Sequence, residues 1–320
     1  MSGGQTIAVT VTDVVTVNDL VKRFEFKRTD GGLLPAFSGG AHTVVEMRDG
    51  ALTRRNPYSL MSDPRDTSAY TISVRRDDQG RGGSLFLHHQ VKVGDQMVIT
   101  APVNLFALDL PARKHLMIAG GIGITPFLAQ IKQLAAMNGN FELHYSVRTA
   151  ALGSYADDLR GQFPNHVHIY HDDQKQMIDL AQLLARQPLG THIYVCGPKG
   201  MIAWVCNSAS AQGWPNSAIH SEEFLAPQSG AAFEVTLARS GQTLHVGENQ
   251  SLLEALEVAG TNPPYLCRGG ACGQCETDVL QHDGDFIHRD HWLSDEDHNS
   301  CTKIMPCVSR FVGKTLVIDR

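Results

Sequence analysis

The stretch Cys267-Arg-Gly-Gly-Ala-Cys272-Gly-Gln-Cys275 governs the interpretation of the whole chain. Its cysteines have C-x4-C-x2-C spacing, and 31 residues separate Cys275 from a fourth cysteine, Cys307. Four thiolates in this pattern are typical of a plant-type [2Fe–2S] centre, in which a short loop wraps one side of the cluster. The pattern therefore predicts that Cys267, Cys272, Cys275 and Cys307 are cluster ligands.

Three glycines lie within the cysteine loop, at Gly269, Gly270 and Gly273. They favour the iron–sulfur interpretation, because backbone amides that turn toward a cluster adopt conformations in which a Cβ is poorly tolerated. A zinc site is the competing interpretation, but zinc ligands tend to come in two separated pairs. A [2Fe–2S] centre carries one electron at a time, so the rest of the chain should contain the source of those electrons.

Length and composition limit the possible classes of protein. At 320 residues the chain suits two or three domains, and its net charge of −6 argues against nucleic acid as a partner. No apolar run reaches the ~18 residues that span a bilayer, and the start of the chain lacks a secretion signal. Cys196, Cys206 and Cys301 lie outside the cluster motif and suit reduced thiols. We therefore expect a cytoplasmic protein without a membrane anchor.

Residues 1–108 are predicted to form an antiparallel β-barrel domain. Alternating or β-branched segments with hairpin signals between them predict several short strands and one short helix, over residues 84–90. Small closed barrels are built in this way. The predicted strands cover residues 6–17, 21–28, 42–50, 70–76 and 95–100.

The segment Arg81-Gly-Gly-Ser84 stands at the predicted start of that helix. Free N–H groups and a partial positive charge at a helix N-terminus favour an anion, and serine is a common cap. We therefore predict a phosphate site here, with a plain glycine turn as the alternative.

Tyr58 and Ser59 follow Arg55 and Asn56 in the same region. A tyrosine that lies flat on a conjugated ring, beside a hydroxyl that reaches a ring nitrogen, is typical of a flavin site. An ordinary pair of strand residues is the alternative.

Residues 109–226 alternate between strands and helices, which predicts a parallel sheet with ligands at the carboxyl ends of its strands. A buried run leads into Gly120-Gly-Ile-Gly-Ile-Thr-Pro126, and a helix is predicted over residues 127–137. Proline stands where the usual dinucleotide fingerprint has its third glycine. A pyrophosphate site is still predicted, because glycines let backbone N–H groups approach it. A purely structural turn is the alternative.

Residues 227–232 are small and polar and are predicted to be a linker to a ferredoxin domain, residues 233–320. A hairpin over residues 233–249 and an amphipathic helix over residues 251–260 precede the cysteine loop. Scattered histidines follow it without the tight spacing of metal ligands, so a solvated face is predicted rather than a second metal site. They are His282, His288, His291 and His298.

Together these segments resemble the phthalate dioxygenase reductase family. The resemblance rests on Tyr58-Ser59, Arg81-Gly-Gly-Ser84, Gly120–Pro126, Val195-Cys-Gly-Pro198 and the cysteine loop, and it covers nearly the whole chain. Within the family it is strongest to carnitine monooxygenase reductases, followed by vanillate demethylase reductases. It implies a multidomain fold with an antiparallel β-barrel flavin domain, an α/β parallel-sheet nucleotide domain, and an α+β (β-grasp) plant-type ferredoxin domain.

The resemblance also implies cofactors and site residues, namely FMN, a [2Fe–2S] cluster and NADH, with Ser59, Thr125, Cys196 and Phe224 at the point of hydride transfer. The implied flavin residues are Arg55, Asn56, Tyr58, Ser59, Ser73, Val74, Arg75, Arg81, Gly82, Gly83, Ser84 and Phe224. The implied nucleotide residues are Gly120, Gly121, Gly123, Thr125, Pro126, Arg148, Cys196, Gly197 and Pro198. The family commonly has arginine where Asn56 stands, which disfavours FAD.

The cofactors fix the order of electron flow. A nicotinamide gives two electrons as hydride, which a cluster cannot accept, so a flavin must stand between them. The implied partner is a Rieske-type oxygenase acting on carnitine or another quaternary amine, with an aromatic acid as the alternative substrate. The chain is expected to be a monomer. A non-catalytic electron carrier and a zinc-stabilised binding protein are the competing hypotheses.

Overall fold

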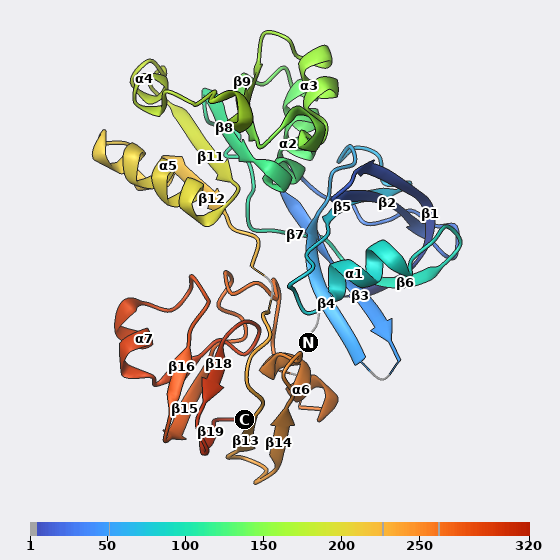
Figure 1. Cartoon of the computed structure of the whole chain (residues 1–320), viewed down its shortest axis with the longest axis vertical. Helices are drawn as coiled ribbons and strands as arrows, with labels where there is room; N and C mark the ends of the chain where they lie inside the picture. The colour runs from blue at the N-terminus through green and yellow to red at the C-terminus, as the bar shows by residue number, and fades with distance from the viewer. Residues whose placement is uncertain (1–4, 51, 226, 262) are drawn as a thin grey trace.

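The computed structural model describes residues 5–50, 52–225, 227–261 and 263–320. The start of the predicted barrel domain and Ala226, the last residue of the predicted nucleotide domain, lie outside this set. The described residues form three lobes that follow one another along the chain, coloured from blue to red in Figure 1. Within them, no helix combines the length and the apolar character needed to cross a bilayer.

The first lobe is an antiparallel sheet of seven strands in the order β4-β3-β6-β1-β2-β5, with β7 paired to β3. The sheet curls around apolar side chains that include the fully buried Phe24, Phe26 and Ile99. The end strands β4 and β5 lie close together, and no ladder joins them among the described residues. The barrel therefore has a seam. Its elements are β1 (Thr6–Asn18), β2 (Val21–Arg28), β3 (Ala41–Asp49), β4 (Leu52–Ser59), β5 (Tyr70–Arg75), α1 (Gly83–His89), β6 (Gln96–Thr100) and β7 (Val103–Asn104).

Strand β4 is missing from the sequence-based prediction. It contains Pro57 and two consecutive arginines, which break the apolar alternation that marks a half-buried strand. Proline cannot donate to a ladder and is tolerated in edge strands. Since β4 ends the sheet and pairs only with β3, Pro57 costs no bond on its outer side.

The second lobe is the predicted parallel sheet, and its five strands have the order β10-β9-β8-β11-β12. The strand order reverses between β8 and β11, and parallel sheets bind ligands at the carboxyl ends of the strands at such a point. The strands are β8 (Lys114–Gly120), β9 (Phe141–Val147), β10 (Val167–His171), β11 (Thr191–Cys196) and β12 (Ile219–Glu222). The helices are α2 (Thr125–Ala136), α3 (Ala156–Gln162), α4 (Leu180–Ala185) and α5 (Lys199–Ala211).

The third lobe is an α+β domain with a mixed sheet in the order β14-β13-β19-β15-β17 and a short hairpin of β16 with β18. The hairpin β13–β14 and helix α6 lie where the sequence predicts them. A capping box starts α6: Ser251 accepts from the Glu254 N–H, and Glu254 accepts from the Ser251 N–H. The elements are β13 (Phe233–Leu237), β14 (Thr243–Val246), α6 (Leu252–Val258), β15 (Thr277–His282), β16 (Asp285–Ile287), α7 (Asp295–Ser300), β17 (Lys303–Ile304), β18 (Arg310–Val312) and β19 (Leu316–Ile318).

Candidate functional site

A cavity of about 860 Å³ lies where the three lobes meet. Its size is in the range of cofactor and ligand sites, ~300–1,000 Å³. The barrel supplies Tyr58 and Ser59 to its wall, the nucleotide lobe supplies Thr125 and Phe224, and the third lobe supplies Cys267. The structure thus brings residues from all three predicted domains to one place.

The barrel opens onto the cavity at the seam between β4 and β5. Tyr58 and Ser59 lie at the end of β4, and Ser73 and Arg75 lie at the end of β5. Burial raises the pKa of Tyr58 to about 12, so its ring is a neutral aromatic surface at physiological pH. Arg75 is exposed and has no ion pair among the described residues, which leaves its guanidinium available to an anion.

The predicted phosphate loop differs from expectation in one detail. Ser84 does not cap helix α1, because its Oγ accepts from the Asp77 N–H at 3.0 Å, and the helix starts one residue earlier, at Gly83. Gly82 precedes it with φ of 90°, a conformation that favours glycine. A Cβ on Gly83 would lie 2.5 Å from Asn56 Nδ2. The loop therefore presents backbone rather than side chains to the cavity.

Two arginines of the predicted flavin site form ion pairs with the third lobe. Arg81 donates to the Glu254 carboxylate at 2.7 and 3.3 Å, and Arg55 lies 3.2 Å from Glu257. Arg54, which the sequence analysis missed, lies against Gly82 and donates to the Arg81 carbonyl at 2.6 Å. Arg54 lies on the same face of β4 as Asn56 and Tyr58, a relationship that becomes visible only once β4 is known to be a strand.

The two glycine segments of the nucleotide lobe pack against each other at the switch point. A Cβ on Gly123 would lie 2.3 Å from the Cys196 carbonyl oxygen, and one on Gly120 would lie 2.7 Å from Pro198 Cδ. Gly121–Ile124 form a 3-10 turn rather than an open loop, and α2 begins at Thr125, earlier than predicted. Thr125 is buried, its hydroxyl donates to the Ile122 carbonyl at 3.0 Å, and its side chain lines the cavity.

Two polar side chains on the cavity wall, the half-buried Glu222 and the buried His42, were not predicted as site residues. Glu222 lies opposite Cys196 in the β11–β12 ladder, and burial raises its pKa to about 8. His42 lies opposite Ser59, and burial lowers its pKa to about 4. Glu222 Oε2 and His42 Nε2 have no hydrogen-bond partner among the described residues. Buried polar atoms are normally paired, so both fit a cavity whose ligand carries polar groups.

The cysteine loop is arranged for a sulfur-bound cluster. Cys267, Cys275 and Cys307 are buried, whereas Cys272 is partly exposed. The N–H groups of Gly269 and Ala271 point at Cys267 Sγ at 3.3 and 3.4 Å. A hydrogen bond from the Cys272 thiol, together with these amides, lowers the pKa of Cys267 to about 5. Cys267 pairs with Cys272 and Cys275 pairs with Cys307, and two neighbouring pairs of sulfurs with amide donors fit an iron–sulfur cluster. Gly270 and Gly273 both have φ of 73°, as the predicted turn requires.

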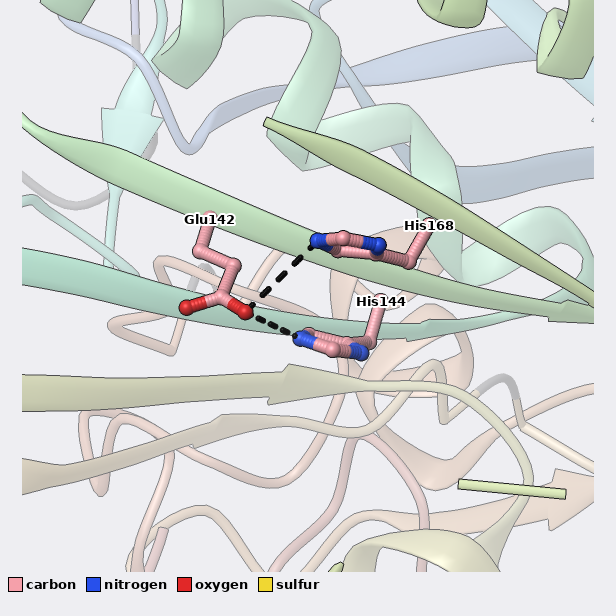
Figure 2. Close-up of side chains that lie close together, drawn as sticks. All are labelled: Glu142, His144 and His168. Atoms are coloured by element: carbon pink, nitrogen blue, oxygen red, sulfur yellow. Dashed lines mark hydrogen bonds and ion pairs between the residues drawn. The ribbon is translucent and has the colours of Figure 1, made fainter. Parts of the chain in front are cut away.

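A second group of potential metal ligands lies away from the cavity, on β9 and β10. Figure 2 shows Glu142, His144 and His168, whose imidazole rings stack at 4.8 Å with an angle of 21°. Nearly parallel rings cannot both direct an in-plane lone pair at one ion. Glu142 also lies 2.6 Å from Lys114 and 3.0 Å from Arg186. The hydrogen bond from His144 and the lysine charge hold the pKa of Glu142 well below its usual range. The group is therefore a structural charge cluster.

Of the four histidines predicted to form a solvated face, His282 and His291 are exposed, whereas His288 is not. His288 has a side chain 10% exposed, and its ring stacks on His298 at 4.4 Å. Asp290, with a fully buried carboxylate, accepts from His298 at 3.2 Å. His291 reaches the cavity wall, where it lies 2.9 Å from Glu223 of the nucleotide lobe. The prediction is therefore wrong for His288, because its ring packs against Phe286 and His298 within the same lobe.

The predicted cofactor residues separate into two groups. One group lines the cavity and the other does not. Val74 belongs to the second group, because its side chain packs in the barrel core. Those on the cavity wall are Asn56, Tyr58, Ser59, Ser73, Arg75, Arg81, Gly82, Gly83, Ser84, Thr125 and Phe224. The others do not line the cavity, and they are Arg55, Val74, Gly120, Gly121, Gly123, Pro126, Arg148, Cys196, Gly197 and Pro198. Their roles toward a cofactor stay predictions.

A barrel with a seam, a parallel nucleotide sheet and a four-cysteine lobe around one cavity define an electron-transfer oxidoreductase. Residues 235–311 match the 2Fe-2S iron-sulfur cluster binding domain, which includes all four cysteines. Residues 101–219 match the N-terminal domain of the dimethylamine monooxygenase subunit DmmA-like family.

Whole-chain comparisons give the family. The chain is 45% identical over 311 residues to the heme-dependent oxidative N-demethylase beta subunit of Ectopseudomonas mendocina, covering 97% of this chain and 98% of the relative. It is 44% identical over 311 residues to a carnitine monooxygenase reductase subunit of Acinetobacter baumannii, covering 97% and 96%. It superposes on phthalate dioxygenase reductase with a TM-score of 0.90 at 32% identity, covering 98% of each chain. The chain belongs to the phthalate dioxygenase reductase family of oxygenase reductases.

Proposed function

We propose that this chain is the reductase component of a two-component Rieske-type oxygenase and passes electrons from NADH through FMN and a [2Fe–2S] cluster to that oxygenase. The cavity shared by the three lobes carries the proposal, because its wall holds Tyr58, Thr125 and the cluster ligand Cys267 together. The relatives are named as reductase subunits of oxygenase systems, which supports an oxygenase as the partner.

FMN would lie at the barrel seam. Tyr58 offers it a neutral aromatic face, and the Ser59 hydroxyl and the unpartnered His42 Nε2 offer polar contacts. Its phosphate would meet the backbone of Gly82 and Gly83. When bound, the flavin would accept two electrons from the nicotinamide and pass them on one at a time.

The nucleotide lobe would position the nicotinamide against the flavin. Thr125 closes one side of the cavity, and Cys196 and Glu222 lie side by side at the carboxyl ends of β11 and β12. Burial raises the pKa of Glu222 to about 8, so the group is largely protonated near neutral pH and can donate a hydrogen bond. Phe224, 45% exposed, would cover the ring plane. Holding reactants in contact geometry can lower a barrier by ~7–11 kcal/mol without an acid–base step.

The division of the chain is part of the proposal. Residues 1–108 would bind FMN, residues 109–226 NADH and residues 233–320 the cluster, with residues 227–232 as linker. The protein would work as a cytoplasmic monomer, since one chain holds all three redox sites. Carnitine or another quaternary amine is the proposed substrate of the oxygenase, and an aromatic acid the alternative.

Anaerobic titration with NADH tests the proposal. Protein reconstituted with FMN, iron and sulfide should lose flavin and cluster absorbance, and it should reduce both ferricyanide and cytochrome c. Ferricyanide can take electrons from the flavin, whereas cytochrome c should depend on the cluster. Material that binds no flavin, or that reduces neither acceptor, would contradict the assignment and would favour a non-catalytic carrier.

A haem-dependent N-demethylase partner is the second candidate. It is favoured by the match of residues 101–219 to a dimethylamine monooxygenase subunit family and by the identity of 45% to an N-demethylase beta subunit. Electron delivery to a purified Rieske carnitine oxygenase and to a purified haem-dependent N-demethylase distinguishes the two. The acceptor that supports substrate-dependent NADH oxidation identifies the partner class.

A further inference from the structure

The cysteine loop has two sides with different surroundings. Cys267 and His291 line the cavity, where electrons would arrive. On the other side the partly exposed Cys272 and its neighbour Gly273 lie outside the cavity lining. The side chain after His291, Trp292, covers this outer side. An electron that enters from the cavity would therefore leave the protein beside Trp292.

Trp292 is placed on the cluster loop itself. A Cβ on Gly273 would lie 2.2 Å from the indole Cε2, so the ring rests directly on the backbone between Cys272 and Cys275. Its Nε1 donates to Glu276 Oε2 at 2.8 Å, which fixes the ring plane. The side chain is nevertheless 51% exposed. A large aromatic held rigidly at the surface loses little entropy on binding, and tryptophan is enriched among residues that dominate protein interfaces.

The surface around Trp292 is acidic. Lys303 lies 3.0 Å from Glu276 and 3.5 Å from Asp297, so these residues form one continuous patch with the indole. Asp295 and Glu296, in the first turn of α7, are exposed and have no ion pair among the described residues. The patch thus carries four carboxylates against one ammonium group. A partner with a basic rim around an apolar recess complements it.

We propose that Trp292, with the acidic start of α7, is the docking surface for the electron acceptor, a redox protein whose surface is basic around its own centre. The indole is the apolar anchor, and the carboxylates steer the encounter. This inference rests on the proposed function, because it needs a cluster that delivers single electrons at this face.

Steady-state kinetics of the full holoprotein test the inference, with cytochrome c as a basic one-electron acceptor protein and ferricyanide as a small acceptor. W292A should raise KM for cytochrome c about tenfold, the loss typical of truncating an aromatic anchor, with ferricyanide reduction unchanged. The matched control is W204A, which truncates another exposed tryptophan, 40% exposed on α5 of the nucleotide lobe. W204A should leave both activities unchanged.

A second variant keeps the test independent of the cluster loop. D295N/E296Q removes two charges that form no ion pair with any residue the structure describes, and it should weaken the ionic-strength dependence of kcat/KM for cytochrome c. If W292A loses the cluster absorbance, its KM is uninformative, and the salt dependence of D295N/E296Q tests the docking surface alone. Equal KM values for W292A and W204A, or an unchanged salt dependence in D295N/E296Q, would overturn the docking surface.

Two further outcomes separate the alternatives. A concentration-dependent dimer that W292A abolishes would assign the face to a second copy of this chain and would overturn the proposal. If wild-type protein reduced no cytochrome c with NADH while ferricyanide was reduced, the proposed function would fail, and the docking proposal with it.

Discussion

Arg81 and Glu254 form a buried ion pair between the barrel and the third lobe, with an N–O distance of 2.7 Å and each side chain 4% exposed. Arg81 precedes Gly82 of the predicted phosphate loop, and Glu254 belongs to the capping box of α6. One turn further along α6, Glu257 binds Arg55 of the barrel. Two glutamates of a single helix thus hold the third lobe against the barrel.

The first prediction concerns this ion pair. Removing one charge of a buried pair leaves the other unpaired and typically costs ~3–5 kcal/mol. E254Q should therefore lower the free energy of unfolding and slow cytochrome c reduction more than ferricyanide reduction, because the cluster is no longer held at the seam. Chemical denaturation and the ratio of the two rates measure the effect. The control is D319N at the exposed Arg239–Asp319 pair, where solvent screening should leave both readings unchanged.

The second prediction concerns Gly123. A Cβ there would lie 2.3 Å from the Cys196 backbone carbonyl, so G123A should push the two glycine segments apart. Such overpacking costs ~1–3 kcal/mol, and KM for NADH should rise with it. Gly161 in α3 has open space around it, so G161A should leave KM unchanged and raise stability by ~0.4–1 kcal/mol. Equal KM values for the two variants would refute a nucleotide site at this turn.

The third prediction concerns the cluster ligands. C272S should lose the cluster absorbance and cytochrome c reduction, since a plant-type centre needs four thiolates, while NADH-dependent ferricyanide reduction persists at the flavin. C301S changes a cysteine outside the ligand set and should behave like the wild type. Persistent cytochrome c reduction in C272S would show that electrons leave by another route.

The fourth prediction concerns pH. Glu222 has a folded pKa of about 8 against an ordinary value of 4.5, so between these values the folded protein binds more protons than the unfolded chain. Stability from this group is then present at low pH and lost as pH rises through about 8. E222Q cannot ionise, so its melting temperature should fall less than that of the wild type from about pH 5 to about pH 8. Parallel curves for the two proteins would contradict the buried, protonated state.

The sequence predicted correctly those features that depend on residues close together in the chain. The cysteine loop, the strands β1, β2, β3, β5 and β6 and the parallel arrangement of the second sheet all follow from local spacing or periodicity. Strand β4 was not predicted, because Pro57 and two arginines interrupt the alternation of apolar and polar residues. Ser84 was predicted to cap α1, but its hydroxyl binds the chain seven residues earlier.

Other parts of the site depend on contacts between distant segments, which no local pattern encodes. Arg81 and Glu254 are 173 residues apart, so nothing near Arg81 shows that a carboxylate already neutralises its guanidinium. The same holds for Glu222, which lies on the wall of a cavity lined by all three lobes.

The fastening of α6 to the barrel restricts which parts of this protein can be exchanged with those of other reductases. Consider a ferredoxin domain from another reductase whose helix corresponding to α6 lacks these two carboxylates. It would bind its cluster, but it would not be held in the correct orientation against the barrel. A domain exchange that keeps electron transfer intact should therefore retain both ion pairs between the two domains. These are Glu254 with Arg81 and Glu257 with Arg55.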